Sequence, residues 1–159
     1  MRVDKIAEYM QNDFSEALEM YRNNLKKHSL KATPQRMAVH KAMLELGHAS
    51  ADIVVGHIKE TGEVPVTTAS VYNILSQLAD LGIYGRRLSS NNKMFFDVNT
   101  ARHFHLYDKE RHIYRDLMDD ELMEIIESKL KKKKFKGLSI ESIDIQIVAR
   151  PTGRSRRTR

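Results

Sequence analysis

The sequence predicts an α+β protein with a helical N-terminal half and a mixed C-terminal part. Three short amphipathic segments follow one another between residues 34 and 81, and two extended segments joined by a polar turn follow over residues 83–98. After residue 98, alternating apolar positions flank a single amphipathic helix. We therefore divide the 159-residue chain into a domain over residues 1–98, a small α/β domain over 99–150 and a basic tail over 151–159.

An additional amphipathic helix is predicted at the N-terminus, over residues 3–27. Its apolar side chains recur near helical spacing, so one face needs a surface to pack against. They are Val3, Ile6, Met10, Phe14, Ala17, Leu18, Tyr21 and Leu25.

A capping residue at the start and a glycine at the end mark each of the next three helices. The starts are Thr33 followed by Pro34, then Ser50, then Thr67 or Thr68; the ends are Gly47, Gly62 and Gly82. The polar residues 89–92 join two predicted strands after the last of these helices. Three helices followed by a hairpin are typical of a winged helix-turn-helix, in which the last helix would enter a DNA groove. The same pattern also fits a small helical domain that binds a protein.

The C-terminal domain is predicted to hold a strand or hairpin over residues 103–114, a helix over 119–131 and an alternating strand over 138–148. Because such a domain has fewer than about 60 residues and its strands end in open edges, we expect it to share them with a second copy, in a homodimer. The tail over residues 151–159 has nothing apolar to bury and is predicted to be disordered.

Composition narrows the classes of function. The net charge is +6, but much of the excess lies in residues 131–134 and in the tail, so charge alone does not indicate nucleic-acid binding. We see no signal peptide and no membrane span, which makes a cytoplasmic location the expectation. Zero cysteine excludes disulfides and thiolate zinc sites, so a metal would need other ligands.

Nitrogen and oxygen ligands of that kind cluster around the domain boundary. His103 and His105 share one face of an extended segment, Asp97 precedes them, Asp116 follows, and His48 lies far upstream. Such a mixed set suits Fe(II) or Mn(II), and Zn(II) would compete for it. A lone His-x-His is weak support for a metal. His112, which has no place in the set, is interpreted as a surface histidine.

Ordered motifs then make a resemblance specific. They are residues 31–36 (KATPQR), 47–52 (GHASAD), 68–73 (TASVYN) with Leu78 and Leu81-Gly82, Phe96-Asp97, and 103–105 (HFH). In this order they resemble the successive signatures of the ferric uptake regulator family, over residues 29–148. The resemblance implies a dimeric, metal-responsive transcriptional regulator with a winged-helix domain and an α/β dimerisation domain.

The resemblance also implies functional residues. In the family's peroxide-sensing branch, the regulatory metal is held by residues that match His48, Asp97, His103, His105 and Asp116. Asp rather than Glu at 116, and Asn rather than Arg at 73, are similar to that branch. The DNA contacts it implies are Lys31, Thr68, Ala69, Ser70, Tyr72 and Asn73.

One departure from the family concerns its structural zinc. Relatives usually carry two Cys-x-x-Cys pairs; the first aligns with Asp108 and Arg111, and the second falls within residues 150–154, so that the zinc site is absent here. The histidine-rich stretch that supplies a further ligand in many iron sensors aligns near residues 142–143, which hold no histidine, so that a third metal site is not expected.

We therefore expect a metal-dependent repressor that binds double-stranded operator DNA when Fe(II) or Mn(II) occupies an interdomain site, with release by peroxide oxidation of a ligand histidine. One alternative is a sensor of iron, manganese or zinc level without peroxide chemistry. Another class is a mononuclear non-heme iron enzyme, disfavoured because five ligands leave little open coordination and no nucleophile motif accompanies them. A haem or a purely structural metal is a further alternative, which an absorption spectrum would separate.

Overall fold

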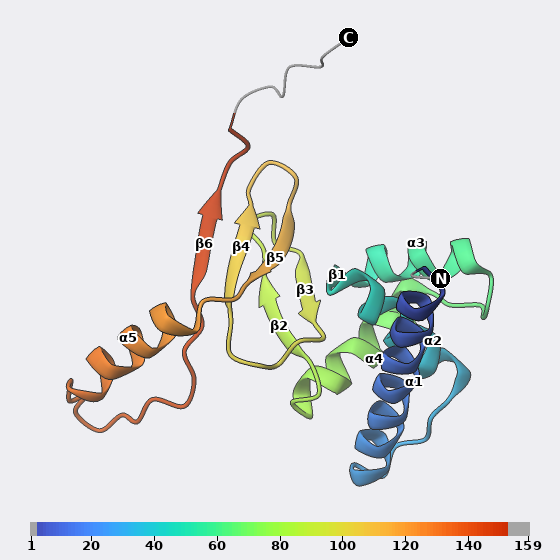
Figure 1. Cartoon of the computed structure of the whole chain (residues 1–159), viewed down its shortest axis with the longest axis horizontal. Helices are drawn as coiled ribbons and strands as arrows, with labels where there is room; N and C mark the ends of the chain where they lie inside the picture. Colours follow the sequence, from blue (N-terminus) through green and yellow to red (C-terminus); the bar gives the residue numbers. More distant parts are fainter. Residues whose placement is uncertain (1–2, 153–159) are drawn as a thin grey trace. The chain divides into compact units, whose positions relative to one another are not determined.

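The computed structural model describes residues 3–152 and divides the chain into two compact units, Met1–Thr100 and Ala101–Arg159 (Figure 1). The first unit holds α1 (Val3–Lys27), α2 (Pro34–Leu46), β1 (His48–Ser50), α3 (Ala51–Thr61), α4 (Thr68–Asp80), β2 (Gly85–Leu88) and β3 (Met94–Asp97). The second holds β4 (Phe104–Asp108), β5 (Ile113–Leu117), α5 (Asp120–Lys131) and β6 (Gln146–Ala149). The α+β class is confirmed. From residue 153 onward, the predicted disordered tail lies outside the described residues.

Local sequence determines where the helices of the first unit begin and end. The Thr33 side chain accepts a hydrogen bond from the backbone N–H of Arg36 and starts α2, and Gly47 ends this helix with φ 71°. Thr67 and Ser70 form a capping box at the start of α4. Ser50 precedes α3, but its hydroxyl makes no capping hydrogen bond.

A single hydrophobic core holds this unit together. It combines buried residues from all four helices with residues of the sheet, including Leu25, Val39, Val54, Leu75 and Phe96. Tyr21 and Leu25 are almost completely buried, so the C-terminal half of α1 is part of this core. The surface that the amphipathic helix required is therefore the winged-helix core itself.

The sheet of the first unit has the order β1-β3-β2. The hairpin of β2 and β3 is the wing that the sequence predicts, with Leu88 opposite Met94. The third strand, β1, was not predicted; it places His48 opposite Asp97. Helices α2 to α4 with this sheet form a winged helix-turn-helix.

The sheet of the second unit has the order β5-β4-β6, with β4 antiparallel to β5 and parallel to β6. Figure 1 shows the long excursion through α5 that this parallel pairing requires. The strand expected over residues 138–148 is wrong in extent: only Gln146–Ala149 is a strand, and residues 138–145 are irregular. Alternation of apolar residues overstates the strand because the strand begins only where pairing with β4 begins, with Gln146 opposite His105.

Candidate metal ligands and DNA-contacting surface

The first unit brings two predicted metal ligands together, His48 and Asp97. They face each other across the β1–β3 ladder, with His48 Nε2 at 3.1 Å from Asp97 Oδ2, and both side chains are 6% exposed. Asp97 Oδ1 accepts a hydrogen bond from the backbone N–H of Asn99 at 2.8 Å, which fixes the carboxylate. We call this pair the first half-site.

The ladder that builds this pair depends on Gly47. Its positive φ ends α2 and turns the chain directly into β1, and its carbonyl accepts a hydrogen bond from the backbone N–H of Val98 at 3.3 Å. Any residue with a side chain would be strained in this backbone conformation. One glycine thus brings two ligands that are 49 positions apart into contact.

The second unit brings together the other three predicted ligands, His103, His105 and Asp116. His103 Nε2 lies 2.9 Å from His105 Nε2 and 3.2 Å from Asp116 Oδ1. Asp116 lies within β5, directly opposite His105 in β4, and His103 immediately precedes β4. Both histidines are buried. We call these three residues the second half-site.

The hydrogen bonds of His103 indicate which of its ring nitrogens could bind a metal. Nδ1 lies 2.7 Å from the carbonyl oxygen of Ala101, which accepts hydrogen bonds only, so Nδ1 carries the proton. In the neutral ring, Nε2 then presents a lone pair to the carboxylate of Asp116, which is also an acceptor. Two acceptors at 3.2 Å attract each other only when a proton or a cation lies between them. This outer hydrogen bond to a backbone carbonyl is typical of metal-binding histidines.

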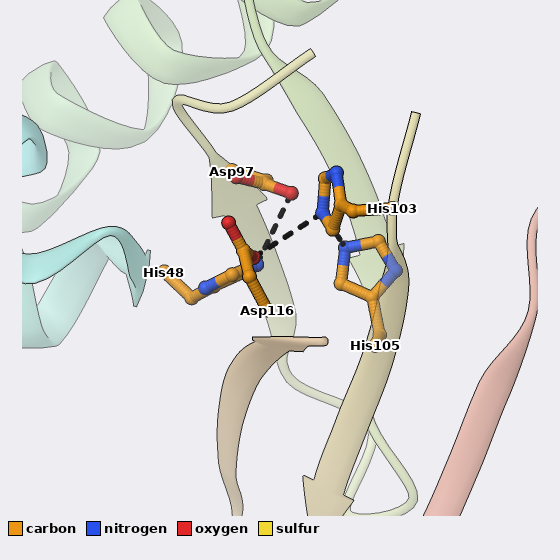
Figure 2. A group of neighbouring side chains, drawn as sticks. All are labelled: His48, Asp97, His103, His105 and Asp116. Atoms are coloured by element: carbon orange, nitrogen blue, oxygen red, sulfur yellow. Dashed lines mark hydrogen bonds and ion pairs between the residues drawn. The ribbon is translucent and has the colours of Figure 1, made fainter. Parts of the chain in front are cut away.

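Figure 2 labels the side chains of both half-sites. The first half-site offers one imidazole and one carboxylate, and the second offers two imidazoles and one carboxylate. Imidazole and carboxylate donors of the kind that each half-site offers suit Fe(II), Mn(II) or Zn(II). Each half-site alone provides fewer than the four or more ligands that such ions usually take.

The predicted DNA contacts in the first unit lie mainly on an exposed face. Lys31, Thr68, Ala69, Tyr72 and Asn73 are exposed, whereas Ser70 is half-buried and its hydroxyl closes the α4 capping box. Tyr72 is 44% exposed. Its ring packs edge-to-face with that of Phe96 in β3, with centroids 6.0 Å apart and planes at 76°.

Two cationic residues of the wing were missed by the sequence analysis, Arg86 and Arg87 of β2. Arg86 is exposed and its guanidinium lies 2.8 Å from Asp80 at the end of α4. The adjacent pair of arginines in a predicted wing strand was the available signal, because winged-helix hairpins lie close to the nucleic-acid backbone and phosphate contacts require cations.

The sequence model of the ferric uptake regulator family matches residues 27–147 of this chain. The chain belongs to the ferric uptake regulator family. The resemblance that the ordered motifs indicated is therefore confirmed. No protein with a curated description matches the sequence at comparable significance.

Solved structures of the ferric uptake regulator family support the fold. The Vibrio cholerae ferric uptake regulator is 22% identical, with a TM-score of 0.69, covering 82% of this chain and 99% of its own. The Pseudomonas aeruginosa regulator, solved with manganese, is 23% identical, with a TM-score of 0.66, covering 83% and 98%. The Campylobacter jejuni peroxide stress regulator is 28% identical, with a TM-score of 0.61, covering 81% and 94%.

This family member lacks the cysteine zinc site, as the sequence predicts, and the turn between β4 and β5 shows what stands there. Asp108 Oδ1 accepts hydrogen bonds from the backbone N–H groups of Glu110 at 2.9 Å and Arg111 at 3.1 Å. The backbone N–H of Arg111 is the main cause that lowers the pKa of Asp108 below its usual value. The carboxylate therefore holds the turn in its charged form.

His112, interpreted as a surface histidine, is half-buried and structural in this family member. Its Nδ1 lies 2.7 Å from the hydroxyl of Tyr107, and its backbone has φ 54°. It belongs to the same turn and to neither half-site. None of the helices described in residues 3–152 carries an apolar stretch long enough to cross a bilayer.

Proposed function

We propose that this protein is a dimeric, metal-dependent transcriptional repressor. It binds operator DNA when Fe(II) or Mn(II) is held jointly by His48, Asp97, His103, His105 and Asp116. The observation that carries the proposal is the pair of half-sites, each of which is incomplete by itself. The side chains of His48, Asp97, His103 and His105 are at most 8% exposed, and Asp116 borders them with its side chain 30% exposed. Together they would supply three imidazoles and two carboxylates to one ion.

Joint ligation gives a physical route from the metal to DNA binding. His48 and Asp97 belong to the winged-helix unit, and the other three ligands belong to the second unit. Ligands drawn from both units restrict the arrangement of the units, so the ligated state favours one arrangement and shifts the population toward it. By linkage, operator DNA should in turn raise the affinity for the ion.

The DNA-contacting surface in this proposal is the exposed face of α4, with Lys31 and the wing arginines at its margins. Tyr72 and Asn73 are exposed on α4 and would reach base edges, while Thr68 and Ala69 begin this helix. Cationic Lys31, Arg86 and Arg87 would contact phosphates, which orient a protein on the duplex without specifying the sequence.

The proposed dimer would bury α5 against the same helix of a second copy. Leu122 and Ile125 are 38% and 45% exposed on this helix, and burial against a second apolar surface would remove them from water. Its first turn is acidic, with Asp120 and Glu121, and its last turn is basic, with Lys129 and Lys131. Around a two-fold axis, antiparallel α5 helices would place each acidic end near the partner's basic end.

Release by peroxide is the finer part of the proposal. Fe(II), when bound, supplies the redox chemistry through which hydrogen peroxide oxidises a neighbouring side chain. In the peroxide-sensing branch that this chain resembles, a ligand histidine is oxidised, and it aligns here with His48 or His103; the 28% identity to a peroxide stress regulator supports this branch. Once oxidised, that imidazole would no longer join the two units, and the protein would leave the operator.

One experiment tests the proposal. A duplex is selected from a random-sequence pool by the Mn(II)-loaded protein, and its affinity is measured for the metal-free, Mn(II) and Fe(II) forms, before and after peroxide. We expect Mn(II) and Fe(II) to increase affinity at least about tenfold, which corresponds to a coupling of about 1.4 kcal/mol. Peroxide should abolish binding of the Fe(II) form only, with one added oxygen on His48 or His103 in the mass spectrum.

The outcomes separate the alternatives. Equal affinity in all three metal states would refute metal-dependent binding. Metal dependence with oxygen found only on methionine would indicate a metal-level sensor, and the eight methionines of the chain make this control necessary. An Asp116→Ala variant should lose the response to metal while retaining its weak binding in the metal-free state.

A further inference from the structure

Two residues at the start of α2 make contacts that the proposed function does not use, Gln35 and Arg36. Gln35 Nε2 donates a hydrogen bond to the carbonyl oxygen of Pro65 at 3.0 Å, just before the α4 cap. Arg36 Nη1 donates to the carbonyl oxygen of Lys31 at 2.9 Å. Arg36 Nη2 donates to Oε1 of Gln77, on α4, at 2.8 Å.

The two guanidinium contacts of Arg36 join segments that both belong to the candidate DNA surface. Lys31 is a predicted DNA contact, and Gln77 lies one helical turn beyond Asn73 on α4. A guanidinium is planar and its donors diverge at fixed angles, so accepting from two of them fixes how the acceptors lie relative to each other. A lysine, with one flexible ammonium group, could not fix both.

The same contacts argue against Arg36 as a direct phosphate ligand. Both Nη groups already donate within the protein, and Nε is buried without a hydrogen-bond partner in the described part of the chain. A phosphate could take the Nη donors only if the contacts to Lys31 and Gln77 broke.

We infer that Arg36, with Gln35, is a positioning residue that holds α4 and the Lys31 segment as one DNA-contacting surface. Gln35 holds the chain that enters α4, and Arg36 holds the C-terminal half of that helix. This inference rests on the proposed DNA binding. In this inference, α2 makes no DNA contact of its own and instead aligns the side chains of α4 and of Lys31 that contact DNA.

The test uses the full-length protein loaded with Mn(II) and five variants: Arg36→Lys, Arg36→Met, Gln77→Ala, the Arg36→Lys/Gln77→Ala double variant, and Arg22→Ala as the control. Arg22 is an exposed arginine that makes an ion pair with Glu19 at 3.3 Å. The probes are the duplex selected by the wild type and a scrambled duplex of equal composition. We expect each single variant to bind the selected duplex about tenfold more weakly, because a lost charge-assisted hydrogen bond is worth about one power of ten.

Further expectations distinguish positioning from a phosphate contact. The double variant should be no weaker than either single one, affinity for the scrambled duplex should be unchanged, and the salt dependence of binding should keep its wild-type slope. A phosphate contact predicts the opposite: Gln77→Ala would bind normally, and replacing Arg36 by Met would reduce the slope by about 1. That pattern would overturn the inference.

A measurement without DNA keeps the inference separate from the proposed function. Hydrogen exchange of the α4 amides should be faster in Arg36→Lys and Gln77→Ala than in the wild type, while α5 amides of the same sample serve as an internal reference. Gln77→Glu keeps an acceptor for Arg36 and should restore protection. Unchanged α4 exchange in both variants would refute the positioning role of Arg36, whether or not the wild type selects any DNA.

Discussion

His40 lies in the core of the first unit between two tyrosine rings. Its ring stacks on Tyr21, with centroids 3.8 Å apart and planes at 11°, and its Nδ1 lies 2.7 Å from the hydroxyl of Tyr84. Burial raises the pKa of Tyr84 well above its usual value, so the hydroxyl keeps its proton and donates to Nδ1. Burial also lowers the pKa of His40 to about 4, and a hydrogen bond to the backbone at Ala17 opposes this shift only in part.

This histidine should make the protein sensitive to acid. The unfolded chain binds a proton at His40 below its ordinary pKa of 6.5, whereas the folded protein resists it down to about 4, so stability is full above pH 6.5 and is lost as the pH falls toward 4. Between pH 7.5 and pH 5 we expect a loss of about 2 kcal/mol from this group, measured by urea unfolding of the metal-free protein.

The matched variants are His40→Phe and His28→Ala. Phenylalanine can keep the stacking on Tyr21 and cannot be protonated, so unfolding free energies of this variant at the two pH values should lie closer together by that amount. His28 is exposed after α1, and its variant should follow the wild type. If His40→Phe shows the full wild-type pH dependence, other groups cause the acid sensitivity.

Residue-scale features differ in how far the sequence predicts them. Motif spacing was sufficient to select the five ligand candidates and most of the exposed α4 residues. The proton on Nδ1 of His103 was not predictable, because it depends on the path of the backbone at Ala101. The stack of His40 was missed for the same reason: its partners come from α1 and from the segment before β2.

Among the elements of the first unit, two helix starts that look alike in sequence differ in structure. The Thr67 side chain accepts a hydrogen bond from the backbone N–H of Ser70 at 3.2 Å, and the Ser70 side chain accepts one from the backbone N–H of Thr67 at 3.1 Å. The hydroxyl of Ser50, at the start of α3, is buried and has no partner in the described residues. A hydroxyl residue at the N-cap therefore caps α4 and leaves α3 without a side-chain cap.

Substitution should reveal this difference between α4 and α3. Thr67→Ala should lower the free energy of unfolding by about 1 kcal/mol, because the first turn of α4 loses its cap. Ser50→Ala should change it by less than about 0.5 kcal/mol, because no capping hydrogen bond is lost. Chemical denaturation of both variants at neutral pH provides the comparison, and equal losses would contradict the distinction.

Elements with strong local signals were predicted well, and those that depend on distant partners were not. Periodicity and caps located α2, α4 and α5. The three-residue strand β1 escaped notice because its signal is shorter than any window of alternation, and it exists because β3 offers an edge. The irregular run before β6 was mistaken for strand because alternation does not determine where the pairing with β4 begins, which is at Gln146.

For the whole molecule, the apolar residues on α5 predict how the protein assembles. An Ile125→Asp variant should sediment as a monomer, because a charge would be buried in the proposed α5 interface without a partner. Met20→Asp is the control: Met20 is 61% exposed on α1, and its variant should keep the wild-type assembly. A dimeric Ile125→Asp variant would place the interface elsewhere on the second unit.

The order of two units in the chain followed from the sequence, since a helical run ends in a hairpin and a mixed run follows. The family as a whole was recognisable because several weak motifs appear in one order. Two long-range contacts within the first unit could not be predicted from the sequence. Helix α1 completes the core, and Arg36 of α2 hydrogen-bonds both Lys31 and Gln77 of α4.

The turn between β4 and β5 has a consequence for the life of the protein in the cell. Its carboxylate anchor is supplied by the chain itself, so the turn can form during synthesis, before any ion has been captured. Zinc starvation would leave this turn intact, and oxidants that attack thiolates would find none in it. Gain or loss of the regulatory metal would then leave the fold of this turn unchanged.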